Sequence, residues 1–271
     1  MTDLKKILQF SEDLCLSAGK ILNRNFGKIK EVKNKSNAID LCTNADIESE
    51  KFIIKKIQET FPEHSILSEE IGELNSDSEY LWLIDPLDGT TNFTHNLPIF
   101  AVSIGLVKKG QGTICGTVYN PAADKLFCAA KKKGAFLNKK PISTTSSNTL
   151  SKSLLVTGFP YIHDNYYDLS FSIFKDFYDR TQGVRRLGAA SLDLCFVAMG
   201  RFDGFYEFNL KPWDICAGAL IAQEAGATCS DWDNSKLPDS GIRILCSNGS
   251  IHNEMVDVLN QGQYKIFYDL K

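Results

Sequence analysis

Two aspartates stand three positions apart where an apolar segment ends, in WLIDPLDGTTNF. Asp85 closes the run YLWLI, which is apolar on both faces and therefore typical of a buried central strand. Asp88 follows after Pro86, close enough for both carboxylates to meet at one point. Two such charges repel unless a cation lies between them, and oxygen donors without nearby His or Cys favour Mg²⁺ over Zn²⁺. The pair therefore predicts a magnesium site.

The residues after Asp88 predict a phosphate site beside the metal. Asp-Gly is also a strong hairpin signal, but a hairpin needs an alternating strand on its far side. The segment TTNFTHNLP supplies polar residues and a proline instead. Gly89, Thr90 and Thr91 therefore suit a turn into a helix N-terminus, whose free N–H groups bind phosphate.

Three further acidic segments could contribute carboxylates, and each also has an ordinary explanation. Glu69 follows a short apolar run in SILSEEIG, where it and Glu70 could be a surface pair. Asp214 begins an apolar helical segment, WDICAGALIAQEAG, where an aspartate can simply cap the helix. Asp46 stands three residues after Thr43 and could complete a capping box. Spacing alone leaves both interpretations open for each of these acids.

The elements that must position these residues change type along the chain. Apolar residues at helical spacing predict a long helix over 4–25, and a second helix is expected over 43–62. Strand-like segments follow, whereas strands and helices alternate in the second half. The Ser/Thr-rich stretch 143–153 separates the two patterns. We therefore expect a mixed α/β fold with an α+β N-terminal half, 1–147, and an α/β C-terminal half, 148–271.

Composition and charge exclude several classes of protein. With 271 residues, 43% of them hydrophobic, the chain can bury a substantial core. Its formal net charge of −3 argues against a nucleic-acid partner. The N-terminus carries no apolar signal segment, and no run approaches the roughly 18 apolar residues of a membrane span. Eight cysteines without a CxxC pair suit reduced thiols, so we expect a cytoplasmic protein without a membrane partner.

Three other features have less specific interpretations. Four lysines in GKIKEVKNK, 27–35, indicate either a solvated hairpin or an electropositive flap that attracts a phosphorylated substrate. Aromatic residues at helical spacing in 165–180 favour packing or a subunit interface. Structural or surface roles are expected for the four histidines, which are isolated from one another: His64, His95, His163 and His252.

Taken together, DPLDGTTNF, the upstream SEE and WDICAGALIAQEAG resemble the signature blocks of the inositol monophosphatase family. The likeness extends over nearly the whole chain, through DLCTNAD, TGFP, RRLGAASLDLCFVAMGRFDGFYE and ILCSNGSIH. It implies a layered αβαβα sandwich with the active site between a larger N-terminal half and a smaller C-terminal half. It also implies a homodimer and sensitivity to Li⁺.

The resemblance implies two Mg²⁺ ions and a weaker third. The first ion would be held by Glu69, Asp85 and the carbonyl of Leu87. The second would be held by Asp85, Asp88 and Asp214, and the third by Glu69 and Asp46.

The resemblance also assigns groups that would bind and attack the substrate. Gly89 and Thr90 would bind the phosphate through their amides, and the Thr90 hydroxyl, paired with Glu69, would activate the attacking water. The residues that would face the inositol ring are Asp88, Ala190, Glu207 and Asp214. Lys35 would lie on the family's mobile N-terminal flap.

We therefore expect a Mg²⁺-dependent phosphomonoester hydrolase that acts on myo-inositol monophosphate through metal-activated water. The shared motif leaves fructose 1,6-bisphosphate, histidinol phosphate, NADP and 3′-phosphoadenosine 5′-phosphate open as substrates. An enzyme with an aspartyl-phosphate intermediate is disfavoured, since the spacing here is D-x-x-D rather than D-x-D. The alternative of another class is a regulatory protein that keeps the metal site without turnover.

Overall fold

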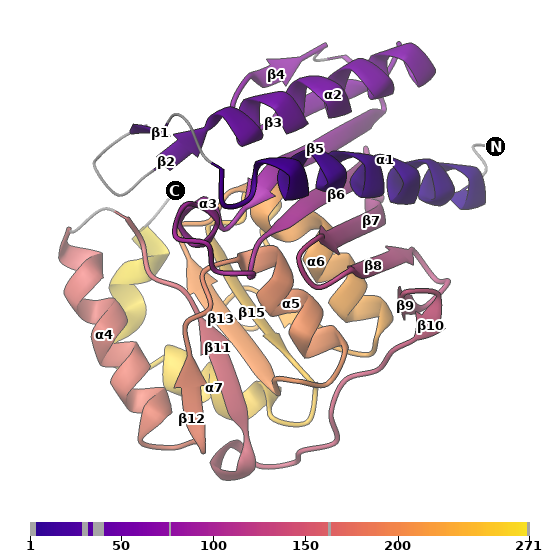
Figure 1. The fold of residues 1–271 in the computed structure, drawn as a ribbon. Helices are drawn as coiled ribbons and strands as arrows, with labels where there is room; N and C mark the ends of the chain where they lie inside the picture. Colours follow the sequence, from indigo (N-terminus) through magenta and orange to yellow (C-terminus); the bar gives the residue numbers. More distant parts are fainter. Residues whose placement is uncertain (1–3, 29–31, 35–40, 76, 162–163, 270–271) are drawn as a thin grey trace.

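The described residues form two large β-sheets, a small two-stranded sheet and three layers of helices (Figure 1). The computed structural model describes residues 4–28, 32–34, 41–75, 77–161 and 164–269. Helices α1 and α2 form the first layer, followed by an eight-stranded sheet, helices α5 and α6, a five-stranded sheet and an outer layer with α4 and α7. The αβαβα sandwich implied by the resemblance is thus confirmed.

Helices α1 (Leu4–Asn25) and α2 (Asn44–Thr60) cover the outer face of the first sheet. The apolar residues at helical spacing in α1 are the ones that it buries, among them Ile7, Leu14, Ala18 and Leu22. Helix α2 begins with the predicted capping box. Within the described ranges, no helix combines the length and the apolar character that crossing a membrane requires.

The first sheet has the strand order β10-β9-β8-β7-β6-β5-β3-β4. Strand β5 pairs in parallel with β3 and antiparallel with β6, and it is buried from Trp82 to Asp88, as its continuous apolar run predicted. The strands span β3 Ser65–Ser68, β4 Gly72–Leu74, β5 Tyr80–Asp88, β6 Ala101–Lys108, β7 Gly112–Asn120, β8 Lys125–Ala130, β9 Ala135–Leu137 and β10 Lys140–Pro141.

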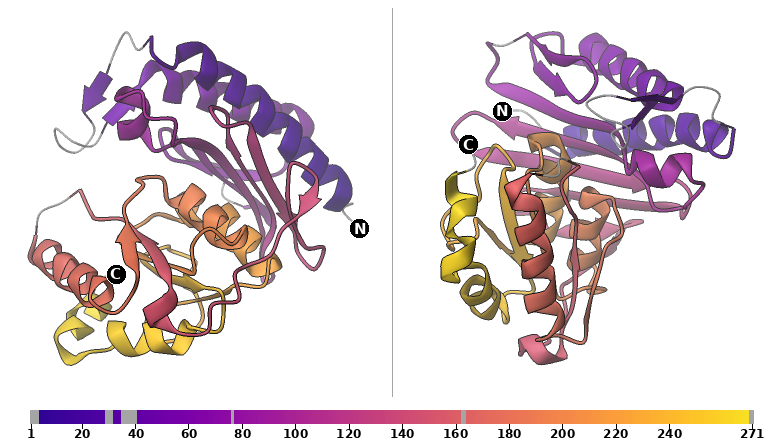
Figure 2. Two further views of the ribbon diagram at one scale, coloured as in Figure 1. Left: turned by 60° about the horizontal axis from the view of Figure 1, so that its bottom comes forward. Right: turned by 90° about the vertical axis from the view of Figure 1, so that its left-hand side faces the viewer.

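Helices α5 (Ala190–Ala198) and α6 (Pro212–Glu224) lie between the two sheets (Figure 2). Both are apolar nearly all round, because each must bury two opposite faces. Glycines in the first sheet allow α6 to approach closely. A Cβ atom at Gly116 would lie 2.8 Å from the Ala217 carbonyl oxygen, and one at Gly105 would lie 2.3 Å from a cysteine sulfur of α6.

The second sheet has the order β12-β11-β13-β15-β14 and carries α4, α7 and η2 on its outer face. Cys229 in β14 pairs with Cys246 in β15, and β14 is a three-residue strand that the sequence analysis did not predict. The elements span η1 Leu150–Lys152, β11 Leu154–Thr157, α4 Asn165–Tyr178, β12 Gly183–Arg185, β13 Gly204–Phe208, β14 Thr228–Ser230, β15 Arg243–Ser247, α7 His252–Leu259 and η2 Gly262–Asp269.

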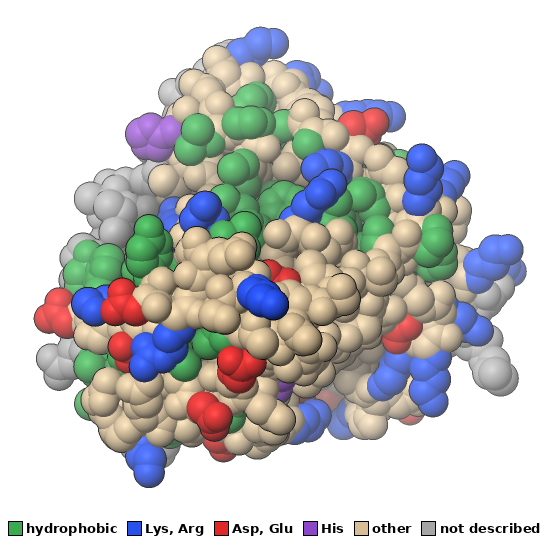
Figure 3. Space-filling view, turned by 90° about the horizontal axis from the view of Figure 1, so that it is seen from below, with side chains coloured by type: hydrophobic (Ala, Val, Ile, Leu, Met, Phe, Trp, Pro, Cys, Tyr) green, Lys and Arg blue, Asp and Glu red, His purple; other side chains and the backbone are tan. Residues whose placement is uncertain are grey.

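The two sheets occupy separate stretches of the chain, with the Ser/Thr-rich segment between them. The division into 1–147 and 148–271 stays a prediction. In a small antiparallel pair, β1 (Val32–Asn34) falls within 27–35, where a hairpin was one of two interpretations, whereas β2 (Leu41–Thr43) lies beyond it; Lys35 falls outside the described residues. Basic and acidic side chains are interspersed over the face shown in Figure 3, without a continuous basic surface among the described residues visible there.

Candidate active site

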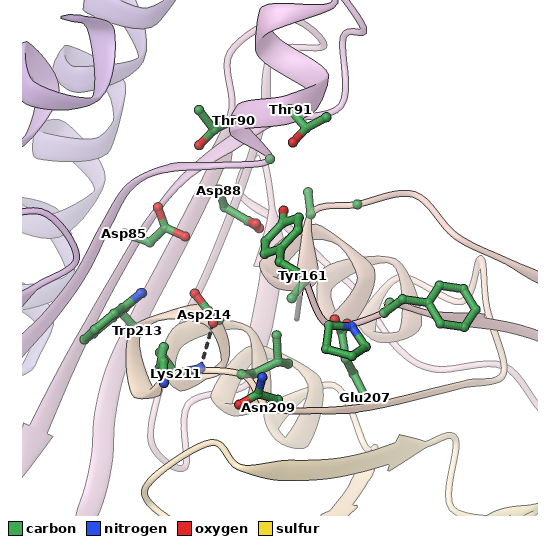
Figure 4. A pocket seen from close by; sticks show the side chains of 18 of the residues that line it. Asp85, Asp88, Thr90, Thr91, Tyr161, Glu207, Asn209, Lys211, Trp213 and Asp214 are labelled. Carbon is green, nitrogen blue, oxygen red and sulfur yellow. Dashed lines mark hydrogen bonds between the residues drawn. The ribbon is translucent and has the colours of Figure 1, made fainter. Parts of the chain in front are cut away.

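A cavity of ≈ 460 Å³ lies where residues of both halves meet. It brings together segments that the sequence analysis selected separately: the strand end of β5, the turn after β3, the start of α6 and the end of β13. The predicted site residues that line it are Glu69, Asp85, Leu87, Asp88, Gly89, Thr90, Ala190, Glu207 and Asp214. Figure 4 shows Asp85, Asp88 and Asp214 around one common space, with Thr90 and Thr91 beside it.

Asp85 and Asp88 reach this space because the β5 strand changes register between them. The pairing with β6 shifts between these two residues, which removes the usual alternation of side chains between the two faces. The Leu87 N–H donates a 3.0 Å hydrogen bond to Asp85 Oδ1 and so orients that carboxylate. Both aspartates are buried. The predicted convergence of the two carboxylates on one cavity is therefore what the structure contains.

Asp88 is also bonded to the C-terminal half. The Ser191 N–H donates to Asp88 Oδ2 over 2.9 Å, and the Ser191 hydroxyl donates to the same oxygen. Ser191 lies in the first turn of α5, where backbone N–H groups have no partner within the helix. A carboxylate from the first sheet therefore caps a helix of the middle layer.

The turn after Asp88 leads into a short helix, α3 (Thr90–Thr94), as predicted, and the alternative hairpin is wrong. Gly89 has a φ of 85°, a left-handed conformation that glycine adopts without strain. A side chain there would also collide, since its Cβ would lie 2.9 Å from the Ile99 carbonyl oxygen. The first N–H groups of α3 border the cavity, and their predicted binding of phosphate stays a prediction.

The Thr90 hydroxyl lies near two oxygen acceptors, and its expected pairing with Glu69 stays a prediction. The Thr90 hydroxyl lies 3.0 Å from the Leu87 carbonyl oxygen and 3.2 Å from Asp46 Oδ1, so it donates to one or the other. Thr90 is the first residue of α3, and its side chain folds back toward the preceding turn, where α2 supplies a carboxylate. The Asp46 carboxylate is thus within hydrogen-bond distance of the Thr90 hydroxyl.

Asp46 lies behind the cavity rather than on its wall. Its Oδ2 accepts hydrogen bonds from the Thr43 N–H at 2.8 Å and the Thr43 hydroxyl at 2.5 Å, which completes the capping box of α2. Possible ligand atoms of Cys42, Asp46 and Glu70 lie within 4.8 Å of one another on this side. The role of Asp46 in a third metal site stays a prediction.

Asp214 enters the cavity from the first turn of α6. Its Oδ2 accepts a 2.7 Å hydrogen bond from the Lys211 N–H (Figure 4), so the cap that explains an aspartate at this position is present. The same side chain lines the cavity opposite Asp85. The two interpretations of Asp214, as a helix cap and as a site residue, are therefore compatible.

The carboxylates that line the cavity repel one another. Burial, followed by the charge of Glu69, raises the pKa of both Asp85 and Asp214 well above the usual range. Burial also raises the pKa of Asp88, against the lowering effect of the Ser191 hydrogen bonds. Converging buried carboxylates must either bind protons or share a cation. All donors are oxygen atoms, so a hard divalent ion such as Mg²⁺ fits the residues present.

A sequence model of the Inositol monophosphatase family matches residues 3–264. The chain belongs to this family. It is 44% identical over 259 residues to Inositol-1-monophosphatase of Synechocystis sp., covering 95% of this chain and 90% of that protein. It is 44% identical over 260 residues to Fructose-1,6-bisphosphatase/inositol-1-monophosphatase of Aquifex aeolicus, covering 95% and 97%. A solved structure, inositol monophosphatase from Anabaena, matches with a TM-score of 0.84 and 41% identity, covering 95% of this chain and 96% of that one.

In this member of the inositol monophosphatase family, Glu207 forms the cavity wall on the C-terminal side. It stands near the end of β13, and burial, followed by the charge of Asp214, raises its pKa to about 8. Gly158 makes room for it, because a Cβ atom there would lie 2.0 Å from Glu207 Oε1. Ala190, at the start of α5, adds a small apolar surface to the same cavity.

Sequence reasoning missed several residues of this inositol monophosphatase cavity. They are Tyr161, Arg186, Asn209, Lys211 and Trp213. Arg186 and Trp213 stand inside the segments RRLGAASLDLCFVAMGRFDGFYE and WDICAGALIAQEAG, and the other three stand within a few positions of a motif. None of them carries a spacing that marks it as a site residue, so position in or beside a motif was the available signal.

Proposed function

We propose that this chain hydrolyses phosphate monoesters of small polyols in a Mg²⁺-dependent reaction, with myo-inositol monophosphate as substrate. The observation that carries the proposal is the cavity lined together by Glu69, Asp85, Asp88, Asp214 and the first residues of α3. Membership of the inositol monophosphatase family supports the same chemistry.

The oxygen donors suit two Mg²⁺ ions. Glu69, Asp85 and the Leu87 carbonyl would hold one ion, and Asp85, Asp88 and Asp214 the other. When bound, the ions would offset the charge of the carboxylates and stabilise the attacking and leaving oxygens of the phosphoryl transfer. A weaker third ion would involve Glu69 and Asp46.

The residues of the chain would position the substrate and move protons. N–H groups of Gly89 and Thr90 at the start of α3 would orient the phosphate. The Thr90 hydroxyl would accept a proton from the attacking water and pass its own hydrogen to a carboxylate, either to Glu69, as the resemblance implies, or to Asp46, whose Oδ1 lies 3.2 Å away. Burial raises the pKa of Asp46 to about 7, so this carboxylate can take up the proton that Thr90 passes on.

The polyol would lie on the C-terminal wall of the cavity. Carboxyl groups of Asp88, Glu207 and Asp214 offer hydrogen-bonding partners for ring hydroxyl groups, and Ala190 offers a small surface on which a ring can rest. Specific recognition of hydroxyl groups by buried polar side chains gives strong discrimination, because an analogue without the hydroxyl leaves those side chains unpaired.

A second candidate substrate is fructose 1,6-bisphosphate. The Arg186 guanidinium lines the same cavity and has no ion pair among the described residues, so it could bind a second phosphate group. The name of the Aquifex relative includes this substrate as well as inositol 1-phosphate. Histidinol phosphate, NADP and 3′-phosphoadenosine 5′-phosphate have no such specific support.

We further propose that the protein is a cytoplasmic homodimer and that Li⁺ inhibits it. Lys35 would belong to a flap, and the boundary between the two halves would lie between residues 147 and 148. Support for the dimer comes from the outer face of α4, where Phe171 is 45% and Tyr178 is 54% exposed. Phe159, which lines the cavity, stacks on Phe171 with ring centroids 4.5 Å apart, so the aromatic surface is continuous with the site.

The test is inorganic phosphate release, with and without Mg²⁺, from inositol 1-phosphate, fructose 1,6-bisphosphate, histidinol phosphate, NADP and 3′-phosphoadenosine 5′-phosphate. We expect kcat/KM to be highest for inositol 1-phosphate and to fall by about 10³-fold in Asp85→Asn and Asp214→Asn. Glu59→Gln, at an exposed position of α2, is the control and should match the parent protein. Full activity of the two folded Asn variants would refute the proposal.

A further inference from the structure

Helix α2 buries a polar face where an apolar face is expected. Asp46, Ser49 and Glu50 stand at helical spacing and share one side of the helix. The exposed fractions of these residues are 0%, 0% and 1%. Buried polar groups cost free energy unless they have partners, so their contacts explain why they are there.

Each of the three residues contacts a different segment of the candidate site. Asp46 accepts a hydrogen bond from Thr90 at the start of α3. The Ser49 hydroxyl donates to the Pro86 carbonyl oxygen over 3.0 Å, within the turn that carries Asp85 and Asp88. Glu50 binds the turn after β3, which carries Glu69. Helix α2 thus supports all three segments of the N-terminal half that reach the cavity.

The contacts of Glu50 surround Glu69 on both sides. Glu50 Oε1 accepts hydrogen bonds from the Ser68 hydroxyl, from the Glu70 N–H at 2.9 Å and from the Ile71 N–H at 3.2 Å. Glu69 itself is held by its N–H, which donates to the Ile84 carbonyl oxygen of β5 over 3.2 Å. The backbone of Glu69 is therefore fixed at its two neighbours and at its own amide.

The second oxygen of Glu50 adds to the cost of burying this side chain. Glu50 Oε2 is buried and has no hydrogen-bond partner among the described residues. A buried carboxylate with one unpaired oxygen is costly, and a neutral side chain could fill the same space more cheaply. A charged Glu50 is explained if its Oε1 is needed to accept hydrogen bonds from three donors of the turn after β3.

We propose that Glu50 is a positioning residue that fixes the turn 68–71 and thereby directs the Glu69 carboxylate at the divalent cation. This inference rests on the proposed function, in which Glu69 is a Mg²⁺ ligand. Partners that orient metal ligands typically change metal affinity or activity by about 10–100-fold when they are replaced. Loss of Glu50 therefore acts on the cation through Glu69, without contact between Glu50 and the cavity.

The experiment measures Mn²⁺ binding to the whole chain by electron paramagnetic resonance of the free ion, with Mn²⁺ in place of Mg²⁺. Glu50→Gln keeps the shape of the side chain but removes its charge. We expect about 10-fold weaker Mn²⁺ binding, and recovery of phosphate release when Mg²⁺ is raised by the same factor. Glu59→Gln, an exposed glutamate of the same helix, should bind Mn²⁺ like the parent protein.

A double variant separates positioning from a general loss of structure. If Glu50 acts through Glu69, then Glu50→Gln/Glu69→Gln binds Mn²⁺ no more weakly than Glu69→Gln alone. Additive losses in the double variant would overturn the inference. Ser68→Ala, which removes one of the three donors to Glu50, should weaken binding in the same direction and serves if Glu50→Gln does not fold.

The outcomes also separate this inference from the proposed function. If Glu69→Gln weakens Mn²⁺ binding while folded Glu50→Gln or Ser68→Ala binds like the parent protein, only the role of Glu50 is overturned. If the parent protein binds no Mn²⁺, both the proposed function and the role of Glu50 are overturned.

Discussion

Replacing Gly158 with alanine should damage substrate recognition without damaging the fold. The added Cβ would lie 2.0 Å from Glu207 Oε1, 2.3 Å from Cδ and 2.4 Å from Oε2. The obstacle is the end of a flexible side chain, and Gly158 is not among the glycines with positive φ. The backbone can therefore accept alanine, provided that the Glu207 carboxyl group moves into the cavity.

The size of the effect follows from that displacement. Carbon atoms in contact are separated by about 3.5–4.0 Å, so the carboxyl group must move by roughly 1.5 Å. A misplacement of about 1 Å can cost about 10²-fold in rate, which is about 2.7 kcal/mol of transition-state stabilisation. We expect kcat/KM for inositol 1-phosphate to fall about 30–100-fold. p-Nitrophenyl phosphate, which has no ring hydroxyl groups for Glu207, should lose no more than about 3-fold.

The assay compares both substrates in Gly158→Ala, Glu207→Gln and the double variant. Because both changes remove the same contact, the double variant should be no slower than Glu207→Gln alone. Gly262→Ala is the matched control, since nothing lies within 4 Å of the Cβ position there. Equal losses on both substrates, or full activity on inositol 1-phosphate in folded Gly158→Ala, would refute the reasoning.

Two further predictions concern stability. Burial raises the pKa of Asp46 from 3.8 to about 7 and that of Glu207 from 4.5 to about 8, so the metal-free folded protein holds protons that the unfolded chain releases. The stability of the metal-free protein should therefore fall as pH rises from about 4 to 8. Mg²⁺ should raise Tm more at pH 8 than at pH 5.5. Differential scanning fluorimetry measures both shifts, and equal shifts at the two pH values would contradict this prediction. His252 is buried, with Nε2 2.9 Å from the Ser230 hydroxyl and Nδ1 3.0 Å from the Ser247 hydroxyl. Replacing it with leucine should lower the free energy of unfolding by about 2 kcal/mol. Urea unfolding measures this loss, and a change below about 0.5 kcal/mol would count against it.

The sequence predicted the elements whose apolar pattern is continuous. Helix α1 follows the predicted bounds, 4–25, because burial of one face imposes a regular period. Strand β14 was missed, since its three residues are too few to show alternation and its pairing with β15 depends on contacts distant in sequence. The structural roles expected of the histidines are confirmed for His64, which accepts from Trp82 Nε1, and for His252.

The site was predictable in its carboxylates but not in the pairing of its polar groups. Asp85 and Asp88 could be predicted because they stand where an apolar run ends in charged residues. The partner of Thr90 could not be read from spacing, because Asp46 stands 44 residues earlier and reaches Thr90 only through the packing of α2. The role of Glu50 could not be predicted for a related reason. On a half-exposed helix that carries several glutamates, the sequence does not distinguish a buried glutamate from the solvated ones.

The contacts of Asp88 limit how the two halves can move. Its carboxylate, from the first sheet, accepts hydrogen bonds from the N–H and the hydroxyl of Ser191 in α5. Separating the halves at this point would break both hydrogen bonds and leave a carboxylate without these partners, which costs free energy. A second connection lies at the far end of α6, where Glu224 accepts hydrogen bonds from the N–H groups of Lys132, Lys133 and Gly134. Both ends of the middle layer are therefore hydrogen-bonded to the N-terminal half, and separation of the two halves would have to break these bonds on both sides.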